Sequence, residues 1–199
     1  MDFLWTPWRY AYVTNSAGKG TRRGVPEELA AWPGDTGCVF CNLLASTDYA
    51  IQQGMSVDHA ERASGILARS ANTFLVLNSF PYNNGHLMVV PYRHESTLAG
   101  LPEPDALEMM LNARRAERAL RSVYNPAGLN LGINLGESAG AGVADHIHLH
   151  AVPRWVGDTN FMTVLGETRI LPEMLAESWR RLRAALASEQ ADSTKPSSS

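Results

Sequence analysis

Three histidines alternate with apolar residues in the C-terminal third of the 199-residue chain, at His146, His148 and His150. Such alternation is typical of a β-strand, in which successive side chains point to opposite faces and the chain rises about 3.3 Å per residue. The pattern predicts a strand over residues 146–153. Its three imidazoles would share one face, with neighbours about 6.6 Å apart.

A row of imidazoles at that pitch is suited to chemistry. A neutral imidazole is a good nucleophile near pH 7, because its unperturbed pKa is about 6.5. The same row would also make a metal-binding face, since imidazole is a common metal ligand. A purely structural row would require a hydrogen-bond partner for every buried ring. The spacing favours a reaction site and leaves both alternatives open.

The chain has two cysteines, Cys38 and Cys41, at the spacing of a zinc knuckle. Two intervening residues allow both thiolates to reach one tetrahedral ion. A redox pair and plain core packing are the alternatives, although a thioredoxin-like role would need a βαβ context that the pattern lacks. Because one close pair cannot staple a secreted fold, the cysteines also favour a reducing compartment.

The glycine-rich segment 136–142 precedes the histidines and resembles an anion-binding turn. Backbone N–H groups that are not blocked by large side chains form nests for phosphate, and we expect Ala141 and Gly142 to supply them. Asn134 is placed to donate an amide hydrogen bond to a phosphate oxygen. A loop without a ligand, and a solvated Asn134, are the alternatives.

The remaining pattern predicts an α+β domain with a largely antiparallel sheet and two main helices. The first helix has a candidate apolar stripe of Leu107, Met110, Leu111 and Leu120. In chain order we expect an apolar element beginning over 40–44, strands over 73–78 and 86–91, a helix over 102–124, strands over 129–136 and 146–153, and a helix over 175–186.

Length favours one domain over residues 1–187. We divide it into an N-terminal arm and loop at 1–37, a core at 38–156 and an extension at 157–187. The polar segment 188–199 is predicted to be a flexible tail.

Composition excludes several classes of partner. With a net charge of −3, the chain lacks the basic surface that a nucleic acid requires. Its apolar runs are too short to cross a membrane, and its N-terminus lacks the pattern of a secretory signal. We expect a cytoplasmic protein that binds a small molecule.

Two segments resemble the histidine triad (HIT) superfamily. Residues 146–152 match its His-φ-His-φ-His-φ-φ motif, where φ is apolar, and residues 84–94 resemble its Gly-His-x-Leu-Val-x-Pro-x-x-His strand. The resemblance covers residues 38–156. The Trp-Thr-Pro-Trp-Arg opening at 5–9 and the segment 152–161 are similar to the bacterial diadenosine tetraphosphate phosphorylases of that superfamily.

The resemblance implies a HIT-like fold and roles for three histidines. His148 would be the nucleophile, forming a nucleotidyl–histidine intermediate. His150 would contact phosphate oxygens and the leaving group, and His86 would brace the triad. Attack by inorganic phosphate on the intermediate would convert diadenosine tetraphosphate to ADP and ATP. The alternatives are an asymmetric hydrolase, a nucleoside phosphoramidate hydrolase and a nucleotide-binding module without catalysis.

The resemblance also implies a structural zinc ion, completed by His94 and His146 beside the two cysteines, with no organic cofactor. Several members of the superfamily are similar in having two cysteines and two histidines at these positions. It further suggests a homodimer that extends the sheet or pairs the helix over 102–124.

Further binding residues follow from the family's nucleoside pocket. Asn78 would contact ribose, and Arg154 would pair with a distal phosphate. Trp155 would stack on a second base, as would Trp5 or Trp8. For each, a structural or solvated role is the alternative. Many members carry Gln where this chain has Gly142, which leaves main-chain donors to bind phosphate. The pocket-lining set is Phe40, Leu43, Phe74, Leu77 and Asn78.

Overall fold

The structure is a computed structural model that describes residues 22–158 and 173–193. The aromatic opening with Trp5 and Trp8, and residues 159–161, lie outside the described residues. Predictions that concern them stay predictions.

The core of the fold is a five-stranded antiparallel sheet with the strand order β1-β2-β3-β5-β4. The two predicted hairpin strands pair as expected, and so do the two that follow the long helix. The α+β prediction with a largely antiparallel sheet is confirmed. The strands are β1 (Ile66–Arg69), β2 (Thr73–Leu77), β3 (Leu87–Pro91), β4 (Gly128–Ile133) and β5 (Leu149–Arg154).

The described residues contain four α-helices, two more than the predicted pair. They also contain the short 3-10 helices η1 (Glu27–Leu29) and η2 (Glu137–Ala139). Residues 45–64 lack a repeat of large apolar side chains, and this composition conceals their helices from pattern analysis. The α-helices are α2 (Val39–Gln52), α3 (Val57–Ser64), α4 (Glu103–Tyr124) and α6 (Leu175–Ser193), the last running into the predicted tail.

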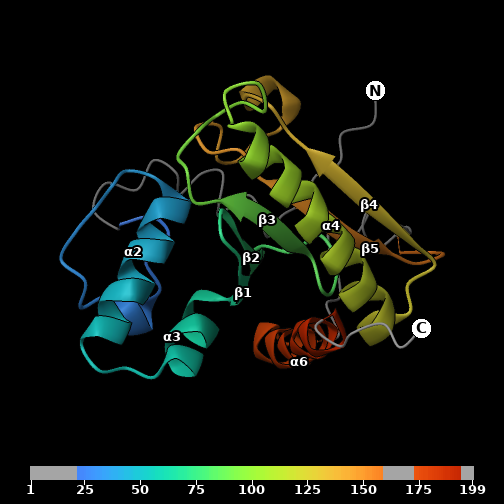
Figure 1. The fold of residues 1–199 in the computed structure, drawn as a ribbon, viewed down its shortest axis with the longest axis horizontal. Coiled ribbons are helices and arrows are strands. Elements are labelled where there is room, and N and C mark those ends of the chain that lie inside the picture. The colour runs from blue at the N-terminus through green and yellow to red at the C-terminus, as the bar shows by residue number, and fades with distance from the viewer. Residues whose placement is uncertain (1–21, 159–172, 194–199) are drawn as a thin grey trace.

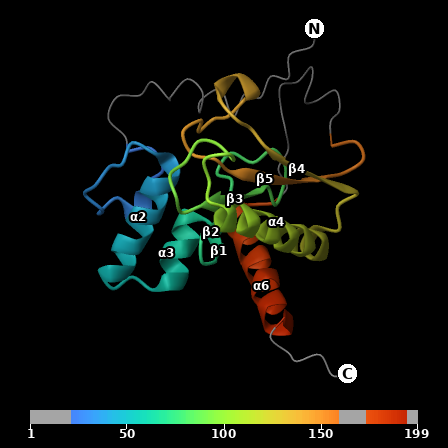
Figure 2. The same cartoon turned by 45° about the horizontal axis from the view of Figure 1, so that its top comes forward.

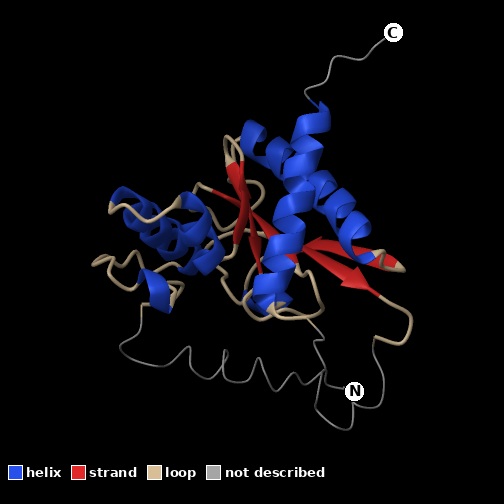
Figure 3. Ribbon diagram, turned by 90° about the horizontal axis from the view of Figure 1, so that it is seen from below, coloured by secondary structure: helices blue, strands red, loops and turns tan. Residues whose placement is uncertain are grey.

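The sheet is covered on both faces. Helices α4 and α6 pack against one face, with Leu75, Val89 and Leu149, and Figure 1 shows α4 crossing β3 and β5. Helix α2 packs against the other face through Phe40 and Leu43. Figure 3 separates the two groups of helices, with the strands between them, and Figure 2 shows α6 extending away from the sheet. Because both faces are covered, every residue of β2 and β3 is buried.

The buried face of α4 differs in part from the predicted stripe. Leu107, Met110 and Leu111 are exposed. Small side chains allow the helix axis to approach the sheet closely, whereas those three longer side chains point outward. The side chains that face the core are Asp105, Met109, Asn112, Ala113, Ala116, Ala119 and Leu120.

Strand β4 is shorter than predicted and only partly covered. Leu129 and Ile133 pack against the core, but Leu131 and Leu135 are 44% and 48% exposed. The predicted single apolar face therefore exists, and half of its leucine and isoleucine side chains are exposed to solvent. They are exposed because β4 lies at the edge of the sheet.

Gly85 occupies a turn that only glycine fits well. Its φ is +74°, and a Cβ added there would lie 2.5 Å from a ring carbon of Tyr124. That ring cannot easily move aside, because its hydroxyl donates to the Glu173 carboxylate and the Arg181 guanidinium lies 4.9 Å from its centre. The turn leads directly into His86.

We expect Gly85→Ala to lower the free energy of unfolding by more than Gly54→Ala does. Gly54 has a φ of +97° and open space around it, so that substitution costs only backbone strain, about 1–2 kcal/mol. Gly85→Ala adds overpacking against Tyr124, about 1–3 kcal/mol more. Urea unfolding measures both, and equal losses would contradict the close packing at Gly85.

Candidate functional site

The backbone of the triad begins before the sheet does. Strand β5 starts at Leu149, whose neighbours are Val89 in β3 and Ile133 in β4. His146 and His148 therefore precede the strand, and the predicted start at residue 146 is wrong by three residues. Strand β3 ends at Pro91, and the main chain of Ile147 instead donates to the Glu95 carbonyl at 2.6 Å.

Strand register brings the pocket floor together. Val76 of β2 pairs with Met88 of β3, and Met88 pairs with His150 of β5. Directly opposed residues of neighbouring strands point to the same face. The three side chains therefore lie in a row on the face that α2 covers, and all three line one pocket.

His148 points one specific nitrogen toward that pocket. Its Nδ1 lies 2.8 Å from the main-chain oxygen of His146, and only a protonated Nδ1 can donate to a carbonyl. In the neutral ring the lone pair is then on Nε2. The residue is 4% exposed, and burial lowers the pKa of the imidazole against the opposing effect of this hydrogen bond. His148 is a neutral imidazole that lines the pocket.

His86 and His150 form a directed pair. The Tyr82 main-chain N–H donates to Nδ1 of His86 at 3.1 Å, which places the proton of the neutral His86 ring on Nε2. That nitrogen lies 2.9 Å from Nδ1 of His150, closer than the amide nitrogen of Asn78 at 3.4 Å. Because Nδ1 of His150 accepts, the neutral His150 ring carries its own proton on Nε2. The arrangement fits the bracing role predicted for His86.

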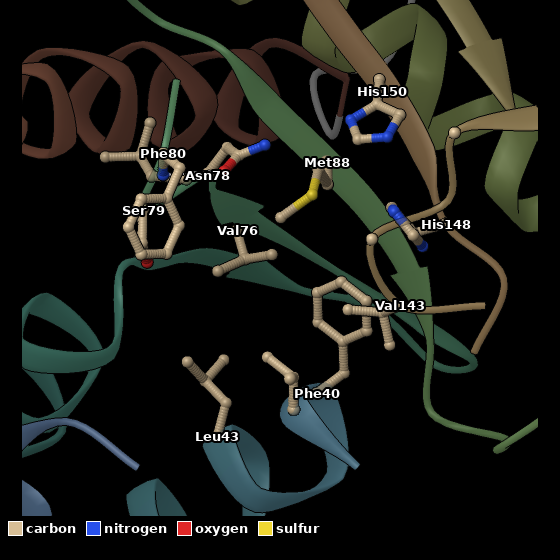
Figure 4. Close-up of a pocket in the computed structure, with 14 residues that line it drawn as sticks. Phe40, Leu43, Val76, Asn78, Ser79, Phe80, Met88, Val143, His148 and His150 are labelled. Carbon is tan, nitrogen blue, oxygen red and sulfur yellow. Dashed lines mark hydrogen bonds between the residues drawn. The ribbon is translucent and has the colours of Figure 1, made fainter. Parts of the chain in front are cut away.

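The pocket itself is mostly apolar, with polar groups at two ends. Figure 4 shows His148 and His150 on one side and Asn78, Ser79 and Phe80 on the other. An apolar pocket with a few convergent polar groups is typical of a small-molecule site, and the resemblance to the family predicts a nucleoside as its ligand. Phe74, predicted as lining, is buried beside the pocket and stacks on Tyr92. The apolar lining residues are Val39, Phe40, Leu43, Val76, Leu77, Phe80, Met88 and Val143.

The glycine-rich loop brings one of its two predicted main-chain donors to the pocket. It folds into η2 between Gly136 and Gly140, both of which have positive φ. Ala141 donates its N–H to the Gly136 carbonyl at 3.3 Å, so this group already has a protein partner. Of the two predicted main-chain donors, Gly142 is the one that lines the pocket.

Arg154, Trp155 and Asn134 do not line this pocket among the described residues. Arg154 binds Asp158 through two nitrogens, at 2.6 and 2.8 Å, and holds the pKa of that carboxyl well below its usual range. Trp155 packs edge-on to Tyr124. Asn134 lies just past β4 and is half-buried. Their roles toward substrate stay predictions.

The four predicted metal ligands meet in space. Cys38, Cys41, His94 and His146 each offer one ligand atom, and these atoms all lie within 4.8 Å of one another. Nδ1 of His146 is 3.3 Å from the Cys38 sulfur and 3.6 Å from the Cys41 sulfur. Nδ1 of His94 is 3.5 Å from the Cys41 sulfur.

These distances fit a tetrahedral zinc ion. With Zn–S near 2.3 Å and Zn–N near 2.0–2.1 Å, adjacent sulfur and nitrogen ligands are about 3.6 Å apart. Nε2 of His146 donates to the Pro91 carbonyl at 2.9 Å, which directs the lone pair on Nδ1 toward the thiols. Burial and the neighbouring Cys38 raise the pKa of the Cys41 thiol to about 11, and a bound cation would reverse that shift.

Comparison with known proteins agrees with the site. A family model described as HIT domain matches residues 59–156. An AP-4-A phosphorylase of Mycobacterium tuberculosis (strain H37Rv) is 44% identical over 179 residues, which cover 90% of this chain and 81% of the relative. The chain belongs to the HIT family. The family resemblance noted in the sequence is thereby confirmed.

Solved HIT structures share the fold. A zinc-bound histidine triad family protein of Mycobacterium smegmatis is 29% identical, with a TM-score of 0.57, and the match covers 81% of this chain and 100% of that chain. A hypothetical histidine triad nucleotide-binding protein of Sulfolobus tokodaii strain 7 also has a TM-score of 0.57, at 21% identity, with 77% and 94% covered. At this identity the second match shows the fold alone.

Pattern analysis missed several parts of this HIT site. Val76 and Met88 looked like ordinary strand residues, although the period of two in their strands indicated which side chains share a face. The carbonyls of Pro91 and His146, which orient two of the rings, left no signal in side-chain types.

Among the described residues, no helix combines the length and hydrophobicity needed to cross a bilayer.

We expect the purified protein to contain about one zinc ion per chain, and Cys41→Ala to contain less than about 0.2. Elemental analysis of protein purified without chelator measures both. His59→Ala is a matched control, because His59 is exposed on α3 and pairs with Glu28. Wild-type protein below about 0.2 zinc per chain would count against the four-ligand site.

Proposed function

We propose that the protein cleaves diadenosine tetraphosphate by phosphorolysis, through a nucleotidyl intermediate on His148. The observation that carries the proposal is the orientation of His148. Its Nδ1 is committed to the His146 carbonyl, so the neutral ring directs Nε2, an unprotonated nucleophile, at a substrate in the pocket that it lines.

In the first step, Nε2 of His148 attacks the α-phosphorus of one nucleotide. The new P–N bond forms as the P–O bond to the leaving ATP breaks. His150 carries its proton on Nε2 and lines the same pocket, so it is placed to donate to the phosphate oxygens and the leaving group. His86 keeps His150 in that tautomer.

In the second step, an oxygen of inorganic phosphate attacks the nucleotidyl group and the P–N bond breaks. The products of the two steps are ATP and ADP, and His148 returns to its neutral form. Water in place of phosphate would give AMP and ATP. The support for phosphorolysis is the relative that is 44% identical over most of both chains and is named AP-4-A phosphorylase.

The decisive assay incubates the protein with diadenosine tetraphosphate, with and without inorganic phosphate, and separates the nucleotides by chromatography. We expect ADP and ATP only when phosphate is present.

His148→Asn should lower kcat by about 10³-fold or more, because the nucleophile is removed. It should leave nucleotide binding measurable by calorimetry. His59→Asn, at an exposed histidine on α3, should behave as wild type.

Other products would contradict the proposal in distinct ways. AMP in both tubes would indicate an asymmetric hydrolase. Cleavage of a nucleoside phosphoramidate, but of no dinucleotide, would indicate a phosphoramidate hydrolase. Binding without turnover of either substrate would leave a nucleotide-binding module.

We further propose that two copies of the chain pair through the edge of β4 and the outer face of α4. An edge strand presents unpaired main-chain groups that favour pairing. Here that edge carries the exposed Leu131, opposite Ala151 on the α4 side of the sheet. The outer face of α4 adds the exposed Leu107, Met110 and Leu111, which one partner copy would cover.

Light scattering coupled to gel filtration tests this pairing. We expect the wild-type protein at twice the monomer mass and Leu131→Asp at the monomer mass, because a carboxylate would be buried at the interface. Val57→Asp is the control, since Val57 is also half-exposed but lies on α3. A monomeric wild-type protein would overturn the proposal.

A further inference from the structure

His148 lies where the sheet does not hold the backbone. The ladders that join β5 to β3 and β4 reach Leu149 and go no further toward the N-terminus. A residue outside a strand keeps its orientation only if other contacts fix it. The position of the nucleophile therefore depends on what surrounds residues 146–148.

The segment from Pro91 to Glu95 supplies part of that support. Its first carbonyl accepts from Nε2 of His146 at 2.9 Å, and its last accepts from the main chain of Ile147 at 2.6 Å. Between them, the His94 ring lies edge-on to the His146 ring, with centroids 5.1 Å apart. The segment thus holds both the side chain of residue 146 and the peptide group that follows it.

His146 joins the cysteine–histidine cluster to the nucleophile. Its imidazole faces the sulfurs of Cys38 and Cys41, and its carbonyl oxygen accepts from Nδ1 of His148 at 2.8 Å. If the residue turns, that carbonyl moves away and the His148 proton is no longer confined to Nδ1. A proton on Nε2 would block the nucleophilic nitrogen.

Phe40 makes a second connection. It lies between the two cysteines in the sequence, and its ring centre is 5.3 Å from that of His146 and 5.0 Å from that of His148. Because Phe40 also lines the nucleoside pocket, the conformation of the Cys38–Cys41 turn reaches the pocket wall and the nucleophile together.

We propose that Cys38, Cys41 and His94 are positioning residues for His148. Together they fix His146, and the carbonyl of His146 keeps the proton of His148 on Nδ1. The inference rests on the proposed function of His148 as the nucleophile. It assigns to the cluster a part in catalysis beyond stabilising the fold.

The test uses His94→Ala. His94 is exposed and does not line the nucleoside pocket, so its replacement removes no side chain from the pocket wall. Long-range nitrogen–proton spectra of protein labelled with ¹⁵N-histidine, at pH 8 where the ring is neutral, report which nitrogen of His148 is protonated. We expect Nδ1–H in the zinc-loaded wild type and a mixture of both tautomers in His94→Ala. Loss of such supporting contacts commonly lowers activity by about 10–100-fold, so kcat should fall by that factor while KM stays within about twofold.

Two further variants separate positioning from general damage. His94→Cys keeps four ligands, and we expect it to restore zinc binding, the Nδ1–H tautomer and a kcat within about threefold of wild type. His59→Ala removes an exposed histidine that pairs with Glu28 and should change none of these readouts. A zinc-free His94→Ala protein that keeps His148 entirely as Nδ1–H, with full kcat, would overturn the proposal.

The spectra decide the proposal even if other parts fail. If wild-type protein shows no turnover, the proposed function fails, and the tautomer of His148 still reports whether the cluster controls it. If His94→Ala does not fold, wild-type protein loaded with cadmium replaces it, because the larger ion lengthens the bonds to sulfur. The nitrogen resonances of His148 should then shift and those of His59 should not. Unshifted His148 resonances would overturn the proposal.

Discussion

The N–H of a buried imidazole needs a hydrogen-bond acceptor, and this requirement sets the orientation of every ring in the site. Nδ1–H of His148 donates a hydrogen bond to the His146 carbonyl, and Nε2–H of His146 donates one to the Pro91 carbonyl. His86 is set in the opposite sense, because it accepts from the Tyr82 main chain and donates to His150. Each ring therefore has one tautomer that suits the role proposed for it: Nε2 of His148 as nucleophile, Nε2–H of His150 as donor, and Nδ1 of His146 as metal ligand.

The sheet and its two layers of helices make this order possible. Antiparallel register sets Val76, Met88 and His150 in one row, and α2 closes the row with Phe40 and Leu43. Low polarity in the pocket keeps His148 neutral, since burial lowers its pKa. The opposite face is held by α4, whose alanines lie against the strands. The same packing holds Tyr124 against Gly85, and so fixes the turn that begins the His86 strand.

The cysteine–histidine cluster ties together segments that are distant in the sequence. Cys38 and Cys41 precede the family-matched region at 59–156, whereas His94 and His146 lie within it. Ligand spacing that fits a tetrahedral ion joins the start of α2 to the residues before β5. His146 belongs to this cluster, and its carbonyl lies 2.8 Å from Nδ1 of the proposed nucleophile His148, so the candidate metal site and the proposed reaction site adjoin each other.

The sequence by itself determined which residues are candidates for the chemistry. Alternation around His146, His148 and His150 and the spacing of Cys38 and Cys41 identified a candidate reactive row and two candidate ligands, because residue types and periods are local properties; the resemblance to the family added His94 and His146 as ligands. The hairpin of β2 and β3 was readable for the same reason, whereas β1 and the order of the sheet were not predicted. The tertiary structure alone decided the rest. It placed Leu107 and Met110 outside and the alanines of α4 inside, because closeness of packing, not hydrophobicity, selects the buried face. It also decided which nitrogen of each ring is protonated, because that depends on carbonyls brought near by the fold, and a main-chain oxygen looks the same at every position of a sequence.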